Sequence, residues 1–567
     1  NIIWNHHLTV PYHTLDEVPA LSFDPAKGEG NIIVEGDNLT ALKALLPQYA
    51  GKINCIFIDP PYNTGNDVAE GIGWTYSDNV NSPVIQQWLN KEVGVDDLTK
   101  HDKWLCMITP RLKLLRDLLD DKGAIFIAID DNEYANLKNI MNDIFGEENF
   151  VANIVWQARK SVQNDTDISV NHNYVLVFAK NRRQKDRRLK EANAEKWYKD
   201  EGFVLRPLTL DKNKFSNPDN DPRGMWKADP FDAPNVRENL TYAIVNPNTG
   251  KEYFPPKGRH WRTEEINYEK LLKEDRILFG KTGRSGPQLK VFWDDKKEYG
   301  EVDTSWWGEG SFDSYIDEDI DFETISEWTN YGTTTSGSQL LQKIFDGEKV
   351  FNNPKPLELL MHIIRQAANK DALILDSFAG SGTTGQAVLE LNKEDGGNRK
   401  FILVQMTEAT EAEPDKNIAR DITAERIKRA IDKYELNSGF TYYKLGTAID
   451  AETLLQGDLP TYEQFAKYVF YLCTGQHHSK PKEIKPKDYF VGNAGNTAIY
   501  LIYQQDFEKL TQLALNLSLA EKFRKASANK PVVVYAPACF LGEEYLQDFN
   551  IQFVSIPYNL FQKNEQP

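Results

Sequence analysis

The chain has 567 residues, 40% of them hydrophobic and 11% aromatic, which is too long for one ordinary core and predicts two or three domains. The net charge of −18 excludes a protein coated in basic surface, so a nucleic-acid partner would need a local basic groove. No run approaches a membrane span, the first residues show no signal-peptide pattern and the four cysteines are scattered. We therefore expect a cytoplasmic protein with no metal site, no disulfide framework and no membrane partner.

The first segment in chain order is an arm over residues 1–30, which we expect to be irregular. Its histidines, His6, His7 and His13, have no acidic or cysteine companions, so they indicate surface rather than metal. Residues 31–37 then predict a strand and a turn, and Asn38 is a plausible cap for the helix that follows. Asp37 stands at the end of this strand, where it either caps the helix or faces a ligand.

The stretch Asp59-Pro60-Pro61-Tyr62 follows the apolar run at residues 53–58, which predicts a short buried strand. Ligand crevices lie at the carboxyl ends of strands in open α/β sheets. The Asp59 carboxylate and the Pro60 carbonyl can accept hydrogen bonds from an exocyclic base amine, Pro60 and Pro61 fix the backbone, and Tyr62 offers a ring for stacking. The alternative is a turn that only closes a strand.

The next elements alternate between helix and strand. Thr109 and Pro110 predict a helix start, Gly123 predicts its end, and residues 124–129, 153–156 and 174–178 predict strands. Between Tyr62 and Asp78 a glycine-rich segment is typical of a flap, in which Trp74 and Tyr76 either line a pocket or pack on the sheet. This alternation predicts an α/β fold with a doubly wound, mostly parallel sheet.

Periodicity weakens after a basic run that begins at Arg182 and Arg183, and tryptophans become frequent up to about residue 340. Cations interleaved with aromatic residues can contact phosphates and stack on bases, although most of these tryptophans can equally form a small core. The candidate DNA contacts are Lys257, Arg259, Lys281, Arg284, Lys290, Arg182 and Arg183. Gly280-Lys281-Thr282 is not a phosphate loop, because Asp275 stands where the first glycine is needed.

A second ligand loop runs from Asp376 to Gly385 and reads Asp-Ser-Phe-Ala-Gly-Ser-Gly-Thr-Thr-Gly. It follows the buried-strand run 372–375 and opens a predicted helix, which is the arrangement of a nucleotide-type pocket. It lacks the Gly-Lys-Ser/Thr ending of a phosphate loop. Alternatively, its small residues only permit tight packing.

Together the two stretches resemble the β class of S-adenosylmethionine-dependent DNA amino-methyltransferases, in which the catalytic stretch precedes the cofactor loop. Residues 392–405 further resemble the Mod subunits of Type III restriction-modification systems. The resemblance implies a Rossmann-like methyltransferase fold with permuted motif order, double-stranded DNA as substrate, adenine N6 as acceptor and base flipping. Asp at position 59 favours adenine, because N4-cytosine enzymes more often carry Ser there.

The resemblance also implies roles for individual residues. Asp59, Pro60, Pro61 and Tyr62 would be catalytic. The cofactor S-adenosyl-L-methionine would be held by Asp37, Asp376, Phe378, Gly380, Gly382, Thr383, Lys355 and Glu408. Lys355 would meet the methionine carboxylate or lie in solvent. The ribose partner stays open, because Gln405 stands where family members carry an acid and Glu408 comes three residues later.

The expected domains are an arm (1–30), a methyltransferase domain in two parts (31–189 and 341–438), a DNA-reading insertion (190–340) and a small α/β assembly domain (439–567). The resemblance implies a homodimer and a helicase-nuclease partner subunit. Three alternatives remain, namely a stand-alone DNA methyltransferase, a catalytically silent DNA-binding specificity subunit and an unrelated nucleotide-dependent enzyme.

Overall fold

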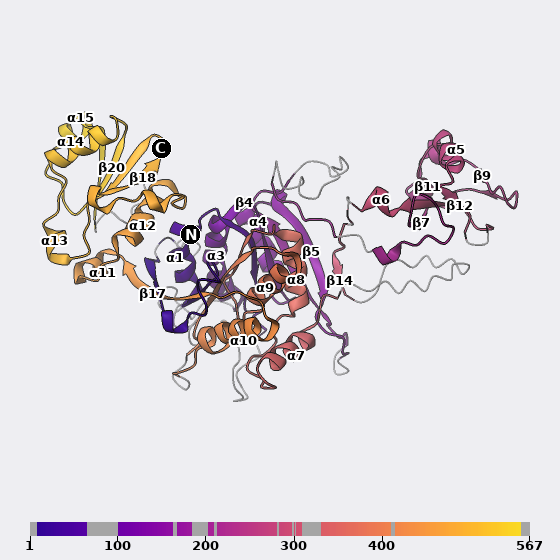
Figure 1. The fold of residues 1–567 in the computed structure, drawn as a ribbon, viewed down its shortest axis with the longest axis horizontal. Helices are drawn as coiled ribbons and strands as arrows, with labels where there is room; N and C mark the ends of the chain where they lie inside the picture. The colour runs from indigo at the N-terminus through magenta and orange to yellow at the C-terminus, as the bar shows by residue number, and fades with distance from the viewer. Residues whose placement is uncertain are drawn as a thin grey trace.

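The computed structural model describes residues 8, 10–64, 100–162, 167–183, 202–208, 212–280, 283–297, 300, 302–308, 330–409 and 414–556. Figure 1 shows a large central body with the small strands β7 to β13 on one side and the strands β18 to β21 on the other. Within the described ranges, no helix has the length and apolar character needed to cross a membrane.

The central body is built on a ten-stranded sheet whose inner strands follow continuous apolar runs. In spatial order the strands are β1 (Tyr12–Glu17), β17 (Thr441–Ile449), β2 (Ile32–Glu35), β16 (Lys400–Gln405), β15 (Leu373–Asp376), β3 (Ile53–Ile58), β4 (Leu119–Ile129), β6 (His172–Ala179), β5 (Phe150–Gln157) and β14 (Trp306–Trp307). The strands from β17 to β4 run parallel, whereas β1 and β6 run antiparallel to their neighbours.

Helices cover both faces of this sheet. On one face lie α1 (Asn38–Tyr49), α3 (Lys100–Leu118) and α4 (Tyr134–Phe145), and on the other lie α8 (Leu357–Ala367), α9 (Thr383–Asp395) and α10 (Glu425–Tyr434). Alternate residues of the buried strands enter the two cores, as at Ile56 and Phe57. The prediction of a mostly parallel sheet with helices on both faces is therefore confirmed.

Some predicted boundaries are wrong. Helix α3 begins at Lys100 rather than at Thr109, contains Pro110, and ends at Leu118, so Gly123 lies inside β4. Burial explains the longer helix, because Trp104, Met107 and Ile108 already pack into the core before the proline. The arm is not irregular throughout either, because Tyr12–Glu17 pairs with β17 at the sheet edge.

The elements between the two parts of the sheet form a small separate unit (Figure 1). They are β7 (Trp226–Pro230), β8 (Asp232–Pro234), β9 (Ile244–Val245), β10 (Glu252–Tyr253), β11 (Arg259–Trp261), α5 (Glu265–Lys273), β12 (Ile277–Leu278), β13 (Gln288–Phe292) and α6 (Trp293–Lys296). Phe231, Trp261 and Tyr268 form its core. The unit is narrower than residues 190–340, because Phe203 and Trp307 are buried in the core of the large sheet.

The last part of the described chain carries a four-stranded sheet of β18 (Phe490–Ala494), β19 (Thr497–Leu501), β20 (Val532–Ala536) and β21 (Ile551–Ser555). Its helices are α11 (Ala451–Gln456), α12 (Tyr462–Thr474), α13 (Phe507–Thr511), α14 (Leu517–Ala526) and α15 (Glu543–Asp548). Helix α12 docks on the central body, where the Tyr468 ring stacks on Tyr12 with centroids 4.4 Å apart.

Candidate active site

The two ligand loops predicted from the sequence follow neighbouring parallel strands. Leu375 of β15 pairs with Ile56 of β3, so the loops after both strands leave the same edge of the sheet. They line one cavity of about 320 Å³. The described residues around this cavity are Phe57, Asp59, Pro60, Tyr62, Thr64, Asp130, Arg159, Asn173, Thr334, Phe351, Asn352, Asn353, Pro354, Lys355, Asp376, Phe378, Ala379, Gly380, Ser381, Thr383 and Thr384.

Asp59 has a donor on each carboxylate oxygen. The Tyr62 hydroxyl donates to Oδ1 at 2.8 Å, and the Lys355 ammonium forms an ion pair with Oδ2. The Lys355 nitrogen also lies 5.2 Å from the centre of the Tyr62 ring. Lys355 is only 8% exposed, so the sequence-based alternative of a solvated lysine at the start of a helix is wrong. Instead, Lys355 joins the two halves of the cavity.

A buried network that the sequence did not reveal supports the Asp59 loop. Trp104 Nε1 donates to the Pro61 carbonyl at 2.7 Å. Asn63 adopts a left-handed backbone conformation with φ of 59°, and its side chain donates to Glu133 Oε1 at 2.5 Å. Glu133 is fully buried and also accepts a 2.7 Å hydrogen bond from Asn136. Nothing local in the sequence marks the contact with Asn63, because Asn63 lies 70 positions before Glu133.

The glycine loop is held close to its neighbours. Gly380 has φ of 52°, and a Cβ there would lie 3.2 Å from the Phe351 ring, so a side chain would be strained and crowded. Its N–H donates to Gln405 Oε1 and its carbonyl accepts from the Thr423 hydroxyl, both at 2.7 Å. Gly382 is the left-handed N-cap of α9. This loop therefore presents bare backbone to the cavity, which fits a ligand that approaches closely.

Asp376 is the buried acid of the second loop. Its carboxylate accepts hydrogen bonds from the Thr384 hydroxyl at 2.5 Å and from the Phe378 N–H at 3.1 Å. Burial raises the pKa of Asp376 to about 7, and the nearby Asp59 carboxylate adds to the shift. A cationic ligand in the cavity would favour the ionised form of this group.

Three predicted cofactor residues, Asp37, Gly382 and Glu408, lie outside the described lining of the cavity. Asp37 caps α1 by accepting from Thr40 N at 3.1 Å, and it also pairs with Arg111 at 3.1 Å. It is thus the N-cap, rather than Asn38. Glu408 accepts from the Gln405 side chain at 3.4 Å. Cofactor roles for Asp37, Gly382 and Glu408 remain predictions.

The candidate DNA contacts are scattered. Lys257 and Arg284 are exposed in the small unit, and Arg259 forms an ion pair with Asp232. Arg182 is exposed beside the large sheet and donates to the Phe150 carbonyl at 2.5 Å, while the neighbouring Arg183 is half-buried. Lys281, Trp74, Tyr76 and the basic residues 185–190 lie outside the described residues. The structure therefore leaves the DNA-contact predictions untested, with one exception.

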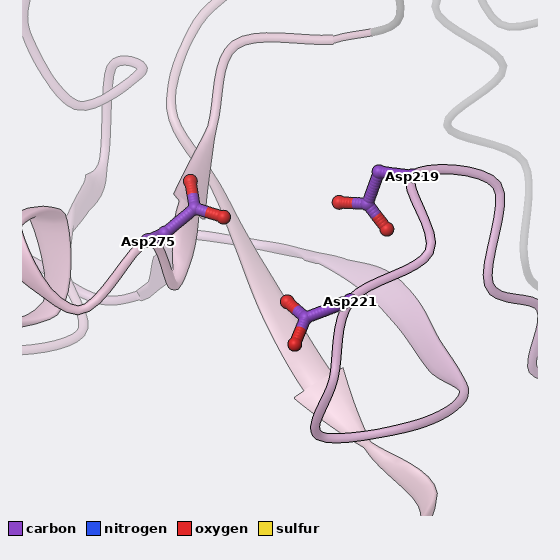
Figure 2. A group of neighbouring side chains, drawn as sticks. All are labelled: Asp219, Asp221 and Asp275. Carbon is purple, nitrogen blue, oxygen red and sulfur yellow. The ribbon is translucent and has the colours of Figure 1, made fainter.

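The exception is Lys290, for which the prediction of a phosphate contact is wrong. It is 5% exposed, and its ammonium lies 2.7 Å from Asp219, 2.8 Å from Asp275 and 3.5 Å from Asp221. Figure 2 shows these three carboxylates converging. Their oxygens lie close enough together to hold a metal ion, but the lysine ammonium contacts all three carboxylates and Arg223 also pairs with Asp221 at 2.6 Å. The cluster therefore stabilises the small unit, because Lys290 links separate segments of it.

Comparison with known proteins agrees with this geometry. A family model described as DNA methylase matches residues 53–416, which is more than half of the chain. The StyLTI Mod subunit of Salmonella typhimurium, a Type III restriction-modification enzyme, is 34% identical over 74% of this chain and 61% of its own length. The EcoP15I Mod subunit of Escherichia coli is 28% identical over 74% of this chain and 66% of its own length. The Type II methyltransferase M.KpnI of Klebsiella pneumoniae is 31% identical over 69% of this chain and 84% of its own length.

Solved structures give a weaker likeness. A DNA modification methylase of Thermus thermophilus, solved in complex with S-adenosyl-L-methionine, covers 73% of this chain and 99% of its own at 11% identity and a TM-score of 0.29. The match to the cytosine-N4-specific PvuII DNA methyltransferase covers 72% of this chain and 94% of that protein, also at 11% identity and with a TM-score of 0.29. At these TM-scores the likeness supports no conclusion about this chain.

The large α/β sheet brings the Asp-Pro-Pro-Tyr loop and the glycine loop to one cavity at the same edge, which is where α/β enzymes of the doubly wound class bind their ligands. The chain belongs to the N6/N4 DNA methylase family, whose cofactor is S-adenosyl-L-methionine. Both the family and the cofactor are as predicted. The chain spans only 61% and 66% of the length of the StyLTI and EcoP15I Mod subunits.

Proposed function

We propose that this protein transfers a methyl group from S-adenosyl-L-methionine to N6 of an adenine that is flipped out of duplex DNA. One observation carries the proposal. The Asp59 loop and the Asp376–Thr384 loop, more than 300 positions apart, line the same cavity from neighbouring strands. Such a cavity allows a donor and an acceptor to meet without a covalent enzyme intermediate.

The chain's own residues supply orientation and electrostatics. Asp59 and the Pro60 carbonyl accept from the amine and stabilise the positive charge that develops on it. The Tyr62 ring stacks on the extruded base, which compensates for lost base stacking in the duplex. The bound cofactor supplies an electrophilic methyl group on its sulfonium. The remaining catalysis comes from holding the two reactants in one orientation.

The choice of adenine over cytosine rests on Asp59, since N4-cytosine enzymes more often have Ser at this position. The test uses purified protein, tritiated cofactor and bacterial DNA, followed by digestion to nucleosides and chromatography. The label should elute with N6-methyl-2′-deoxyadenosine. Label in N4-methyl-2′-deoxycytidine would overturn the adenine assignment, and no label in DNA would favour a silent specificity subunit.

We also propose that the protein is the modification subunit of a Type III restriction-modification system, acting in the cytoplasm as a homodimer with a helicase-nuclease subunit. Within residues 190–340, the small unit would read the DNA, and the part of residues 439–567 that follows β17 would mediate assembly. The Mod-type relatives support this assignment. M.KpnI, matched over 84% of its length, supports a stand-alone methyltransferase instead. Affinity purification at native expression separates the two, because only the first recovers an ATP-dependent nuclease.

A further inference from the structure

Three exposed aliphatic side chains gather on the connection between β5 and β6. Val162, Ile168 and Val170 are 67%, 81% and 48% exposed. In the described parts of residues 10–64, 100–183 and 330–449, which carry most of the large sheet, no other large hydrophobic side chain is exposed. Exposed hydrophobic residues that occur singly are ordinary, whereas several on one connection are typical of an interaction surface.

The same connection reaches the mouth of the cavity. Arg159, two residues after the end of β5, lines the cavity and is also exposed. Its backbone N–H donates to the Asn171 carbonyl at 3.0 Å, and Asn173 in β6 lines the cavity as well. A side chain that borders a cavity and also faces solvent lies at its opening. The exposed aliphatic residues therefore lie on the segment that borders the place where a base would enter.

The charge of this segment suits DNA. Arg159 and Lys160 are exposed cations, and Asp167 is the one acid among the described residues between β5 and β6. Within the described part of the chain, no carboxylate pairs with the Arg159 guanidinium. The whole chain carries a net charge of −18, so a cation without an acidic partner at the cavity mouth is a local exception. Phosphate binding needs such a local site rather than a basic surface throughout.

Base flipping makes two demands at the mouth of the cavity. The phosphates on either side of the extruded adenine stay in the DNA strand, and a gap opens in the base stack. A guanidinium meets a phosphate with charge-assisted hydrogen bonds. An aliphatic side chain can enter between base steps and fill such a gap. Among the three exposed aliphatic residues, Ile168 is the most exposed and is therefore the best placed to do so.

We infer that this connection is a DNA-binding surface, in which Arg159 binds a phosphate beside the flipped adenine and Ile168 fills the gap that the base leaves. The inference rests on the proposed function, because it assumes that a base moves from duplex DNA into this cavity. It assigns part of the DNA interface to the large sheet itself, in addition to the small unit.

The Arg159 contact is tested by the salt dependence of DNA binding. A short duplex that the wild type methylates is labelled with a fluorophore, and its affinity is measured by anisotropy at several salt concentrations. One phosphate contact contributes about 0.9 to the slope of log K against log salt concentration, so Arg159→Met should reduce the slope by about one. Arg159→Lys should keep most of the slope, because the charge remains. Arg365→Met, which removes an arginine paired with Glu394, should leave the slope unchanged.

The Ile168 contact is tested by the cost of extruding the base. Single-turnover methyl transfer is measured on the same duplex and on a second duplex with an abasic site opposite the target adenine. A base without a pairing partner costs less to extrude. Ile168→Ala should therefore slow transfer about tenfold on the paired duplex, but less than about threefold on the second. Leu517→Ala, which shortens an exposed aliphatic side chain at the start of α14, should change neither rate.

Both tested side chains are exposed, so the melting temperatures of the variants should match that of the wild type. An unchanged salt slope in Arg159→Met would overturn the inference. It would also be overturned if Ile168→Ala slowed transfer equally on the two duplexes, or on neither. A wild type that methylates no DNA would instead count against the proposed function.

Discussion

The Lys355 ammonium forms an ion pair with Oδ2 of Asp59 although the two residues are 296 positions apart. An adenine amine would need an oxygen of the same carboxylate, above the same Tyr62 ring. Under the proposed function, Lys355 and the target base would therefore compete for Asp59. We expect the lysine to move before the base is held.

Replacing Lys355 with Met should leave Asp59 and the Tyr62 ring available to the target base even when no cofactor is bound. In the wild type we expect 2-aminopurine, placed beside the target adenine as a reporter of base extrusion, to fluoresce weakly until cofactor is added. In Lys355→Met the cofactor-free signal should rise severalfold, because the competing ammonium is gone. Lys522→Met, which removes a surface lysine paired with Asp488, serves as a control. An unchanged signal in Lys355→Met would show that the ion pair does not compete with the base.

Glu133 should matter for the turnover rate more than for cofactor binding. It anchors Asn63, directly after Tyr62, and does not touch the glycine loop. Glu133→Ala leaves buried donors without this acceptor and should cost about 1–3 kcal/mol of stability. Steady-state kinetics should show a lower kcat with little change in the cofactor KM. A KM effect as large as the kcat effect would mean that Glu133 supports the whole cavity.

The raised pKa of Asp376 predicts that the stability of the cofactor-free protein depends on pH. Its folded pKa is about 7, compared with 3.8 as the ordinary value. Between these values the folded protein keeps a proton that the unfolded chain releases, so the contribution of Asp376 to stability is greatest below pH 4 and falls as pH rises to 7. A shift of one pKa unit between the folded and unfolded states changes the free energy of unfolding by about 1.4 kcal/mol. Urea unfolding between pH 5 and 8 should show a flatter profile in Asp376→Asn, and parallel profiles would contradict the shift.

Replacing Lys290 should make the stability of the protein depend on added metal ions. Removing its ammonium leaves Asp219, Asp221 and Asp275 facing one another, with Arg223 still beside Asp221 (Figure 2). Asp219 and Asp275 are exposed, so we expect a smaller loss than for a fully buried pair, about 1–3 kcal/mol. Lys290→Met should therefore melt earlier, and millimolar Ca²⁺ should restore part of the loss because carboxylate oxygens are its preferred ligands. Wild-type protein should not respond to Ca²⁺, and a variant that also fails to respond would show that the carboxylates separate.

The sequence predicts those parts of this structure that local patterns determine. The apolar runs before Asp59 and Asp376 became β3 and β15 because continuous hydrophobic residues suit buried parallel strands. Helix α3 was misjudged because the buried Trp104 and Met107 outweigh the break expected at Pro110. The contacts of Lys355 with Asp59 and of Glu133 with Asn63 could not be predicted. Each joins residues far apart in the chain, and a charged residue gives no local sign of its partner.

The central claim is that two loops form one reaction site with separate duties, and Asp59→Ala tests it most directly. We expect this variant to bind S-adenosylhomocysteine with wild-type affinity, because the glycine loop is intact. Single-turnover transfer of tritiated methyl to duplex DNA should fall at least about a hundredfold, as when a positioned hydrogen-bonding group is removed from a reaction centre. Wild-type transfer rates in Asp59→Ala would contradict the account.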